Sequence, residues 1–312
     1  MMSPPMDGKE IQLSASTTPA TGATARIARL FVYPVKSCAG IALDESLLLD
    51  TGLDLDRAWM VVDEQGEFVS QREQPRLALV QPQFKRGGSE LVLRAAGMLA
   101  LHLAVDVVEE SVRVRVWDDE VRAYDMGDIA AQWFTDFLSL TSAGLPAAGG
   151  ARYRLVRFDP DERRLSSPAW TQGLEAPNQF SDGFPLLVLG QASLDELNTR
   201  LQAAGHASVG IERFRPNIVL SGLSAHEEDR LDRLQIDGGD TAPVLRLVKP
   251  CARCGIPDID PLTAQPGQAV SEALRAYRQD ARLKGALTFG MNAIVQSGAE
   301  SVLRVGQAVQ LG

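Results

Sequence analysis

Short apolar segments separated by turn residues run along most of the chain. Runs of about four to eight apolar, aromatic or β-branched residues bounded by Gly, Pro, Asn or Asp are typical of the strands of a barrel or sandwich. The pattern therefore predicts a β-rich protein. We predict strands within 26–33, 41–49, 54–62, 77–80, 91–94, 99–103, 112–117, 121–124, 153–158, 178–189, 218–220, 244–248, 291–295 and 301–311.

Helical periodicity interrupts this pattern at three places. Gly127–Leu140 has an apolar face and a possible N-cap residue in Asp128. The residues predicted to form that face are Ile129, Trp133, Phe134, Phe137 and Leu138. We also predict helices over Leu194–Ala204, capped by Ser193, and over Val270–Arg278, capped by Ser271.

A boundary between two units is predicted where the sequence becomes small and poor in charge, at Thr141–Gly150. Residues 1–25 are rich in Ser, Thr, Ala and Pro and predict a disordered tail. The expected organisation is an N-terminal β-barrel-like domain over 26–145 and a second β-barrel domain over 150–312. The fold class is mixed, a β-rich α+β protein with a few peripheral helices.

Composition narrows the class of protein. The 312 residues are 45% hydrophobic and carry a net charge of −9, which argues against a nucleic-acid-binding surface. Three cysteines are too few for a disulfide framework and fit a reducing compartment. We find no secretory signal and no apolar run long enough to cross a bilayer, so a cytoplasmic location is expected.

The segment Leu245–Gly255, L-R-L-V-K-P-C-A-R-C-G, holds two of the three cysteines. The apolar run predicts a buried strand that ends at Pro250, which would place Cys251 in the loop that follows. Lys249 and Arg253 flank Cys251. Nearby cations lower the pKa of a thiol and favour the thiolate, the form that binds metals.

Four interpretations of the Cys251 and Cys254 pair compete. The first is half of a zinc site, but the chain offers no second pair of ligands, since the other candidates are Cys38 and three scattered histidines. A thioredoxin-like dithiol would lie near the start of a βαβ pattern. Two buried, inert cysteines would sit poorly beside two charges. A single thiolate ligand to a soft metal centre remains, and a nucleophilic Cys–His pair is a lesser alternative.

Other loops carry cations suited to an anion. Pro34–Gly40 lies between two predicted strands and contains Lys36, Ser37 and Gly40, the last of which would let a ligand approach the backbone. Arginine is suited to bidentate contacts with phosphate. An ordinary turn with an exposed lysine is the alternative for this loop, and a solvated or salt-bridged surface position is the alternative for each arginine, which we accept for Arg76.

Five segments, in the same order, resemble one family, the MOSC proteins. Y-P-V-K-S-C-A-G, D-L-D-R-A-W-M-V and Q-R-E-Q-P-R-L resemble its N-terminal β-barrel domain, while R-F-R-P-N-I-V and K-P-C-A-R-C resemble the MOSC domain itself. They lie at Tyr33–Gly40, Asp54–Val61, Gln71–Leu77, Arg213–Val219 and Lys249–Cys254. The branch that contains the mitochondrial amidoxime-reducing components and their bacterial counterparts is the most similar, from Arg26 to the C-terminus.

This resemblance implies a molybdenum cofactor, a pyranopterin that carries molybdenum and a phosphate. Cys251 matches the cysteine that ligates molybdenum, so it is the predicted catalytic and metal-binding residue. The implied cofactor-binding residues, with Arg72 a weaker addition, are Lys36, Ser37, Arg57, Ser181, Asp182, Arg213, Arg215 and Asn217. Asn217 would suit the mixed donor and acceptor edge of a pterin.

The resemblance further implies an oxidoreductase that reduces N-hydroxylated compounds, such as amidoximes and N-hydroxy bases. Three cysteines cannot ligate a four-cysteine iron–sulfur cluster, so electrons are expected from a separate ferredoxin, flavin reductase or cytochrome. The alternative function is a carrier of the cofactor or of sulfur, because MOSC domains also occur in molybdenum cofactor sulfurases.

Overall fold

The structure is a computed structural model that describes residues 24–107, 110–139, 151–238 and 242–312. The predicted linker Thr141–Gly150 lies outside the described residues, as do residues 1–23 of the predicted tail. Thr24 and Ala25, also assigned to the tail, begin the first strand. Within the described ranges, no helix combines the length and the apolar composition needed to cross a membrane.

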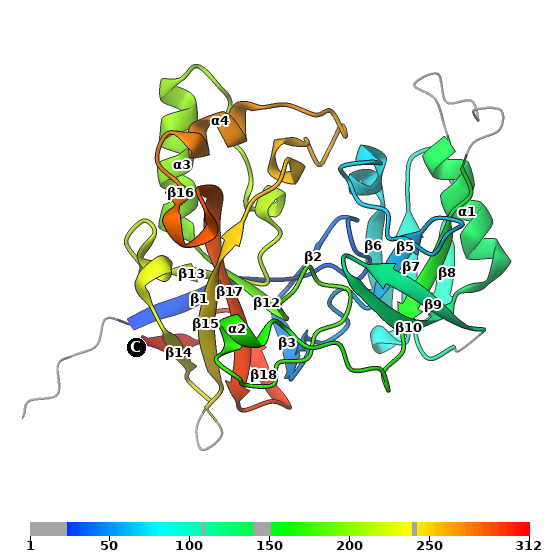
Figure 1. Cartoon of the computed structure of the whole chain (residues 1–312), viewed down its shortest axis with the longest axis horizontal. Helices are drawn as coiled ribbons and strands as arrows, with labels where there is room; N and C mark the ends of the chain where they lie inside the picture. The colour runs from blue at the N-terminus through cyan, green and yellow to red at the C-terminus, as the bar shows by residue number, and fades with distance from the viewer. Residues whose placement is uncertain (1–23, 108–109, 140–150, 239–241) are drawn as a thin grey trace, which may run out of the picture.

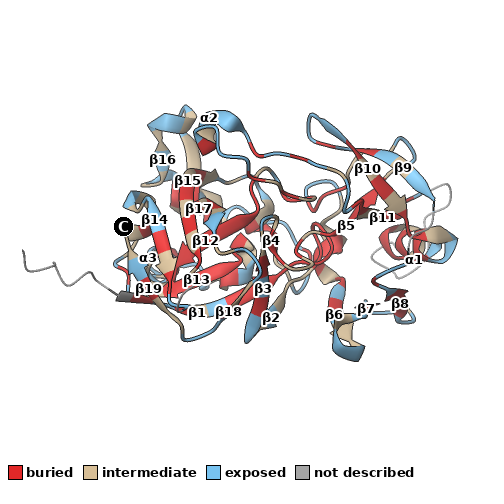
Figure 2. Ribbon diagram, turned by 90° about the horizontal axis from the view of Figure 1, so that it is seen from below, coloured by how far each residue is buried: buried red, intermediate tan, exposed pale blue. Residues whose placement is uncertain are grey.

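Seven strands close into a barrel, which lies on the left of Figure 1. Each strand is hydrogen-bonded to the next, and the last pairs with the first. Their apolar side chains form one buried core inside the barrel. Buried residues accordingly follow these strands in Figure 2. In barrel order the strands are β12 (Leu186–Gly190), β13 (Ile218–Ser221), β1 (Thr24–Val32), β19 (Ala308–Leu311), β14 (Arg233–Ile236), β15 (Val244–Ala252) and β17 (Ala286–Ser297).

Smaller strands and helices surround the barrel. β2 (Ile41–Leu43) pairs with β1, β16 (Gln279–Asp280) with β17, and β3 (Glu45–Leu49) lies between β4 (Gly52–Leu53) and β18 (Ser301–Arg304). The helices α3 (Gln191–Ala203) and α4 (Ala269–Arg275) pack against each other beside the barrel, and α2 (Pro168–Thr171) contacts β15.

Two further sheets and one helix form the other side of the molecule, on the right of Figure 1. Trp133, Phe134 and Phe137 of the helix lie in their shared core. One sheet contains β5 (Trp59–Val62), β11 (Arg154–Phe158), β10 (Asp119–Asp125) and β9 (Ser111–Val116); the other contains β6 (Gln81–Lys85), β7 (Glu90–Arg94) and β8 (Leu101–Ala104); the helix is α1 (Gly127–Ser139).

The fold class predicted from the sequence, a β-rich α+β protein with barrel architecture, is confirmed. The predicted boundaries of its two domains stay a prediction, and strands pair across them. β1 comes from the N-terminal segment yet lies between β13 and β19 of the barrel. β11 follows the predicted linker yet pairs with β5 and β10 on the other side. The chain therefore crosses between the two sides more than once.

The predictions for Leu77–Val80 and for Ile129 were wrong. The apolar residues Leu77–Val80 do not form a strand, because Pro75 begins a short 3₁₀ helix, η1 (Pro75–Leu79), that buries Leu77. Ile129 does not belong to the apolar face of α1, since 79% of its surface is exposed. The helix turns Trp133 and Phe134 inward and leaves Ile129 toward solvent.

The three residues predicted to cap helices have other roles. Asp128 forms an ion pair with Arg154. Ser193 lies inside α3 and donates its hydroxyl to the buried carboxylate of Glu228 at 2.7 Å. Ser271 lies inside α4 and donates its hydroxyl to a backbone carbonyl. Helix starts cannot be placed from a nearby Ser or Asp alone, because the capping group can come from a distant loop.

Asp258, which lies outside α4, provides hydrogen-bond acceptors for the first turn of that helix. Its Oδ1 accepts the backbone N–H of Val270 at 2.9 Å and that of Ser271 at 3.1 Å. A carboxylate at this place pairs two donors that have no partner within the helix and interacts favourably with the helix dipole. The short helix η6 (Ile256–Asp258), which carries Asp258, also borders the cleft described below.

We therefore predict that Asp258→Ala lowers the free energy of unfolding by about 1 kcal/mol, the usual cost of losing an N-cap. Ser271→Ala, which removes the cap predicted from the sequence, should change it by much less. Urea denaturation of the two variants beside the wild type would measure both effects. A larger loss in Ser271→Ala than in Asp258→Ala would contradict this assignment of the cap.

Candidate functional site

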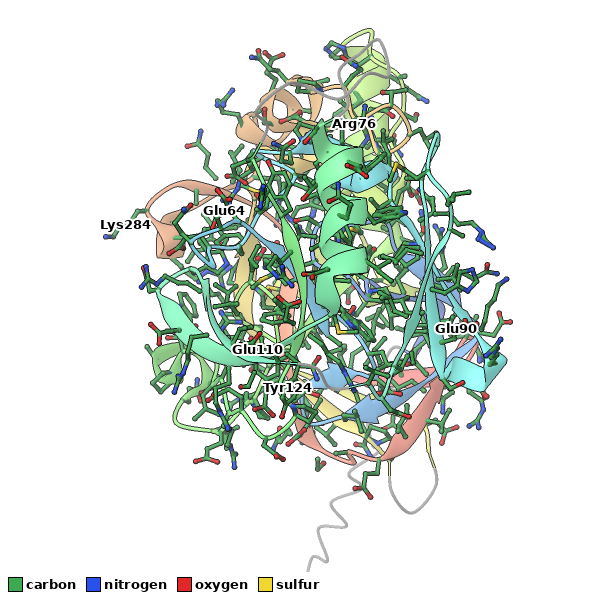
Figure 3. The ribbon with its side chains drawn as sticks, turned by 90° about the vertical axis from the view of Figure 1, so that its right-hand side faces the viewer. Glu64, Arg76, Glu90, Glu110, Tyr124 and Lys284 are labelled. Carbon is green, nitrogen blue, oxygen red and sulfur yellow. The ribbon has the colours of Figure 1, made fainter. Side chains whose placement is uncertain are left out.

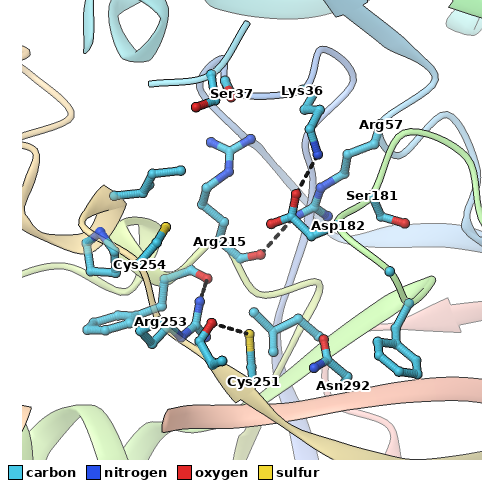
Figure 4. Close-up of a pocket in the computed structure, with 18 of the residues that line it drawn as sticks. Lys36, Ser37, Arg57, Ser181, Asp182, Arg215, Cys251, Arg253, Cys254 and Asn292 are labelled. Atoms are coloured by element: carbon cyan, nitrogen blue, oxygen red, sulfur yellow. Dashed lines mark hydrogen bonds and ion pairs between the residues drawn. The ribbon is translucent and has the colours of Figure 1, made fainter. Parts of the chain in front are cut away.

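One cleft brings together all nine residues predicted from the sequence to bind the cofactor or the metal, and Figure 4 shows most of them. Its walls come from the loop after β1, from the loop before β12, from the segment between η3 (Ile211–Phe214) and β13, and from the end of β15. The residues it unites are Lys36, Ser37, Arg57, Ser181, Asp182, Arg213, Arg215, Asn217 and Cys251. Arg72 also lines it, whereas Arg76 lies beside α1, over the ring of Phe137 (Figure 3).

Lys36 is a buried cation with an acidic partner. Only 7% of its side chain is exposed, and its Nζ donates to Asp182 Oδ1 at 2.5 Å and to the carbonyl of Phe180 at 2.8 Å. Burial lowers the pKa of Lys36, and the Asp182 carboxylate opposes that shift. Lys36, which was predicted to bind an anion, therefore already forms an ion pair with a carboxylate of the protein.

Asp182 projects into the cleft, with 74% of its side chain exposed. Although the walls of the cleft partly desolvate the carboxylate, the Lys36 ammonium group and the Arg57 guanidinium hold the pKa of Asp182 well below its usual range. Trp117 Nε1 donates to the same oxygen at 3.3 Å. Asp182 thus stays ionised and is the acidic group among the cations of this wall.

Arg164 shapes the loop that carries Ser181 and Asp182, although it lies in none of the motifs selected from the sequence. Its buried guanidinium donates to Asp119 at 2.7 Å, to Asn178 Oδ1 at 2.6 Å and to the Ser181 carbonyl at 2.6 Å. The hydroxyl of Ser181 turns to Asn178 rather than toward the centre of the cleft. The contacts of Arg164 join this loop to the start of β10.

Arg57 and Arg215 are neighbouring cations, and the guanidinium of Arg57 is hydrogen-bonded to the backbone of Arg215. Arg57 donates to Asp56 at 2.5 Å and to the Arg215 carbonyl at 3.0 Å. Arg215 donates one Nη1 hydrogen to the carbonyl of Cys38 at 2.5 Å, while its buried Nη2 has no hydrogen-bond partner among the described residues. Burial, and then the charge of Arg57, lower the pKa of Arg215 to about 10. It remains a cation at neutral pH with donors to spare.

Asn217 serves the fold at this position. Its side-chain oxygen accepts from the backbone N–H of Leu187 at 3.1 Å and from Arg57 at 3.2 Å, and its Nδ2 donates to the Phe31 carbonyl at 3.2 Å. The carboxamide therefore joins the ends of β1 and β12 and holds one arginine. The expected contact with a pterin stays a prediction, and only the second Nδ2 hydrogen has no bond described for it.

Two other arginines of the cleft are directed at protein groups. Arg213 donates to Asp260 at 2.9 Å and to the Pro257 carbonyl at 3.2 Å. Arg253 donates to the carbonyls of Phe289 and Phe214, each at 2.9 Å. These contacts fix the segments around the two cysteines.

The prediction that a strand ends at Pro250 was wrong. β15 continues through Cys251 to Ala252, with an irregular register between Pro250 and Ala252 where it pairs with β17. Proline is tolerated at such a bulge because a ladder hydrogen bond is already lost there, and a bulge redirects the side chain of the extra residue. Cys251 therefore meets the cleft from the end of a strand rather than from a loop.

The two cysteines of this segment differ in exposure. Cys251 is half-buried, and burial raises the pKa of its thiol, an effect that Arg253 and Lys249 only partly oppose. The expectation of a lowered thiol pKa at Cys251 was wrong because desolvation outweighs the two cations. Cys254 is exposed and lines the same cleft. Figure 4 shows both sulfur atoms on this wall, with Arg253 between them.

Trp117 and Asn292 also line the cleft, and the sequence analysis missed both of them. Trp117 lies in the tight turn after β9 with a φ of 56°, a left-handed conformation uncommon for a large side chain. Its ring packs against Phe68, and the Arg72 guanidinium lies 4.6 Å from its centre. The described residues include no group of three or more His, Cys, Asp and Glu side chains placed to hold a metal ion.

Comparison with known proteins agrees with the resemblance found in the motifs. The family described as "MOSC N-terminal beta barrel domain" matches residues 24–141, and the family described as "MOSC domain" matches residues 175–310. The mitochondrial amidoxime reducing component 2 of Bos taurus is 34% identical over 261 residues, or 81% of this chain and 72% of that protein.

Two other relatives extend the comparison. The mitochondrial amidoxime-reducing component 1 of Homo sapiens is 35% identical over 263 residues, covering 81% of this chain and 72% of that protein. The molybdenum cofactor sulfurase of Bos taurus is 29% identical over 272 residues, covering 81% of this chain and 29% of the sulfurase. The match to the sulfurase therefore involves less than a third of that protein.

The exposure of the three thiols predicts their order of reaction in the metal-free chain. Iodoacetamide should alkylate Cys254 first, Cys251 more slowly and buried Cys38 least, because the thiolate reacts and access limits it. Since the pKa of Cys251 is raised, its rate should climb at a higher pH than that of a free thiol, and Lys249→Met should move it higher still. Mass spectrometry between about pH 7 and pH 10 would follow each site. Alkylation of Cys251 ahead of Cys254 at the lowest pH would contradict this order.

Proposed function

The chain belongs to the family of MOSC domain proteins that includes the amidoxime-reducing components, and we propose that it is a molybdenum-cofactor-dependent reductase of N-hydroxylated compounds. The association of the family with the molybdenum cofactor carries the coarser part of this proposal. The finer part, reduction of amidoximes or N-hydroxy bases, follows from the activity in the names of its relatives. The observation that supports it most is the convergence of all nine candidate residues on one cationic cleft.

The cleft fits an anionic cofactor in its charge and in its unused donors. Lys36, Arg57 and Arg215 lie against the loop that carries Ser37, and the buried Nη2 of Arg215 has no partner among the described residues. An unpaired donor at a buried site is costly unless a ligand satisfies it, and a phosphate oxygen is a suitable acceptor. In this proposal these three cations and Ser37 hold the phosphate of the cofactor.

A thiolate from the Cys251 and Cys254 pair would ligate the metal. Cys251 is the residue expected from the sequence, and Cys254 is the more exposed thiol on the same wall. Both satisfy the preference of a soft metal centre for sulfur. Arg253, between them in sequence, fixes this segment through carbonyls of Phe214 and Phe289 and so sets where both sulfurs lie.

When bound, the cofactor would supply two-electron reduction and accept the substrate oxygen. This chain's own residues would bind and orient the cofactor and shape the opening of the cleft. Phe68, Trp117 and Phe184 add aromatic surface to the lining of the cleft, and the Arg72 guanidinium lies over the Trp117 ring. We further propose that the electrons come from a separate protein, which agrees with the word "component" in the names of the relatives.

The test is turnover of the molybdenum-loaded protein with an aromatic amidoxime and a reduced viologen as the electron source. The wild type should form the amidine, and one of the variants Cys251→Ser and Cys254→Ser should lose at least about 100-fold in rate, because a ligand to the metal matters at least as much as the groups around it. The other variant is the matched control. Loss in Cys251→Ser would support the assignment from the sequence, and loss in Cys254→Ser would move the ligand three residues along.

Two results would count against the proposed function. Full activity in both cysteine variants would exclude a cysteine thiolate as a required ligand of the metal. A loaded protein that holds molybdenum but reduces no N-hydroxylated compound would favour a carrier of the cofactor or of sulfur, the alternative to which the match with molybdenum cofactor sulfurase points.

A further inference from the structure

Tyr33, which follows β1 directly, lies beneath the two arginines of the cleft. The guanidinium carbon of Arg57 is 4.4 Å from the centre of the Tyr33 ring, and that of Arg215 is 4.2 Å from it. The ring is buried and does not line the cleft itself. Any influence of Tyr33 on a ligand must therefore pass through these arginines.

The two guanidinium groups carry like charges in a partly buried place, which is unfavourable without compensation. Asp56 neutralises Arg57 through a contact of 2.5 Å. Arg215 has no carboxylate among its described hydrogen-bond partners, and it donates to the carbonyl of Cys38 instead. An aromatic ring attracts a cation through its negative face, so the Tyr33 ring compensates both charges without using any of their hydrogen-bond donors.

The surroundings of Tyr33 hold the ring in this place. Its N–H donates to Asp56 Oδ1 at 2.7 Å, and its carbonyl accepts the N–H of Arg57 at 2.9 Å. Gly40 packs against the ring so closely that a Cβ at Gly40 would lie 2.5 Å from Tyr33 Cε1. Gly40 was expected to let a ligand approach the backbone, but in the structure its missing side chain makes room for the Tyr33 ring.

We propose that Tyr33 is a positioning residue that presents Arg57 and Arg215 as a pair to an oxyanion such as a phosphate group. The inference rests on the proposed function only for the identity of that ligand. The same cluster would bind any oxyanion of suitable size, because cation–π contact orients the guanidinium planes and leaves the unpartnered Nη2 of Arg215 available.

The ring, and not the hydroxyl, performs this role. Tyr33 Oη is buried and has no hydrogen-bond partner among the described residues. Removing a buried hydroxyl that makes no bond costs little, and it can stabilise a protein. Tyr33→Phe keeps the aromatic face and should therefore preserve the arginine pair, whereas Tyr33→Leu removes the face.

The experiment measures binding of inorganic phosphate and of molybdate to the metal-free full chain by calorimetry at constant ionic strength. We expect Tyr33→Phe to bind within about twofold of the wild type and Tyr33→Leu to bind at least about tenfold more weakly, given two cation–π contacts. Gly40→Ala changes no charge but pushes on the ring, so it should also weaken binding. Because Tyr33→Leu leaves a cavity, circular dichroism must first show that it folds; if it does not, Gly40→Ala and Tyr33→Phe still decide the matter.

A double-mutant comparison separates positioning from general damage to the fold. The loss caused by Tyr33→Leu should shrink in an Arg215→Met background and persist in a Lys36→Met background, because Lys36 has no contact with the Tyr33 ring among those described. Equal losses in both backgrounds, or weakened binding in Tyr33→Phe, would overturn the proposal. Because anion binding needs neither cofactor nor turnover, it can fail or succeed independently of the reductase function.

Discussion

Several cations converge on one partly buried cleft, and most of the local structure serves to compensate their charge. A buried charge is expensive unless it is paired and hydrogen-bonded. Lys36 has Asp182, Arg57 has Asp56, and Arg213 has Asp260. Arg253 is satisfied by backbone carbonyls, and only Arg215 keeps a buried donor without a described partner. The protein thus compensates nearly every positive charge on its own and leaves one position where an incoming anion gains the most.

The barrel brings these residues together because the chain does not fold in sequence order. β1, near the N-terminus, lies between β13 and β19, so the loop after it meets the segment that contains Arg215 and Asn217. The carboxamide of Asn217 bonds the ends of both β1 and β12. The loop before β12 and the end of β15 complete the walls. Residues from both sides of the molecule line the site, and family models match both parts of the chain.

Much of this arrangement could be read from the sequence, and the failures have physical causes. Alternating and apolar runs predicted most strands, and five motifs predicted residues that do line one cleft. Arg164 and Asp258 could not be found, because each acts on a segment distant in sequence. The strand that contains Cys251 was predicted to end at Pro250, because a bulge that tolerates proline has no recognisable pattern in the local sequence. The pKa of the Cys251 thiol is raised rather than lowered, because the flanking charges can be read from a sequence and the burial of the thiol cannot.

The most direct test of the central claim is the molybdenum and pterin content of protein purified from a host that makes the cofactor, for the wild type, Arg215→Met and Arg76→Met. We expect near-stoichiometric molybdenum in the wild type and in Arg76→Met, where the lost cation lies outside the cleft. Arg215→Met should hold at least about tenfold less, because a charge-assisted hydrogen bond to the cofactor is gone. Wild-type protein without molybdenum, or equal molybdenum in Arg215→Met, would contradict the claim that this cationic cleft holds the cofactor.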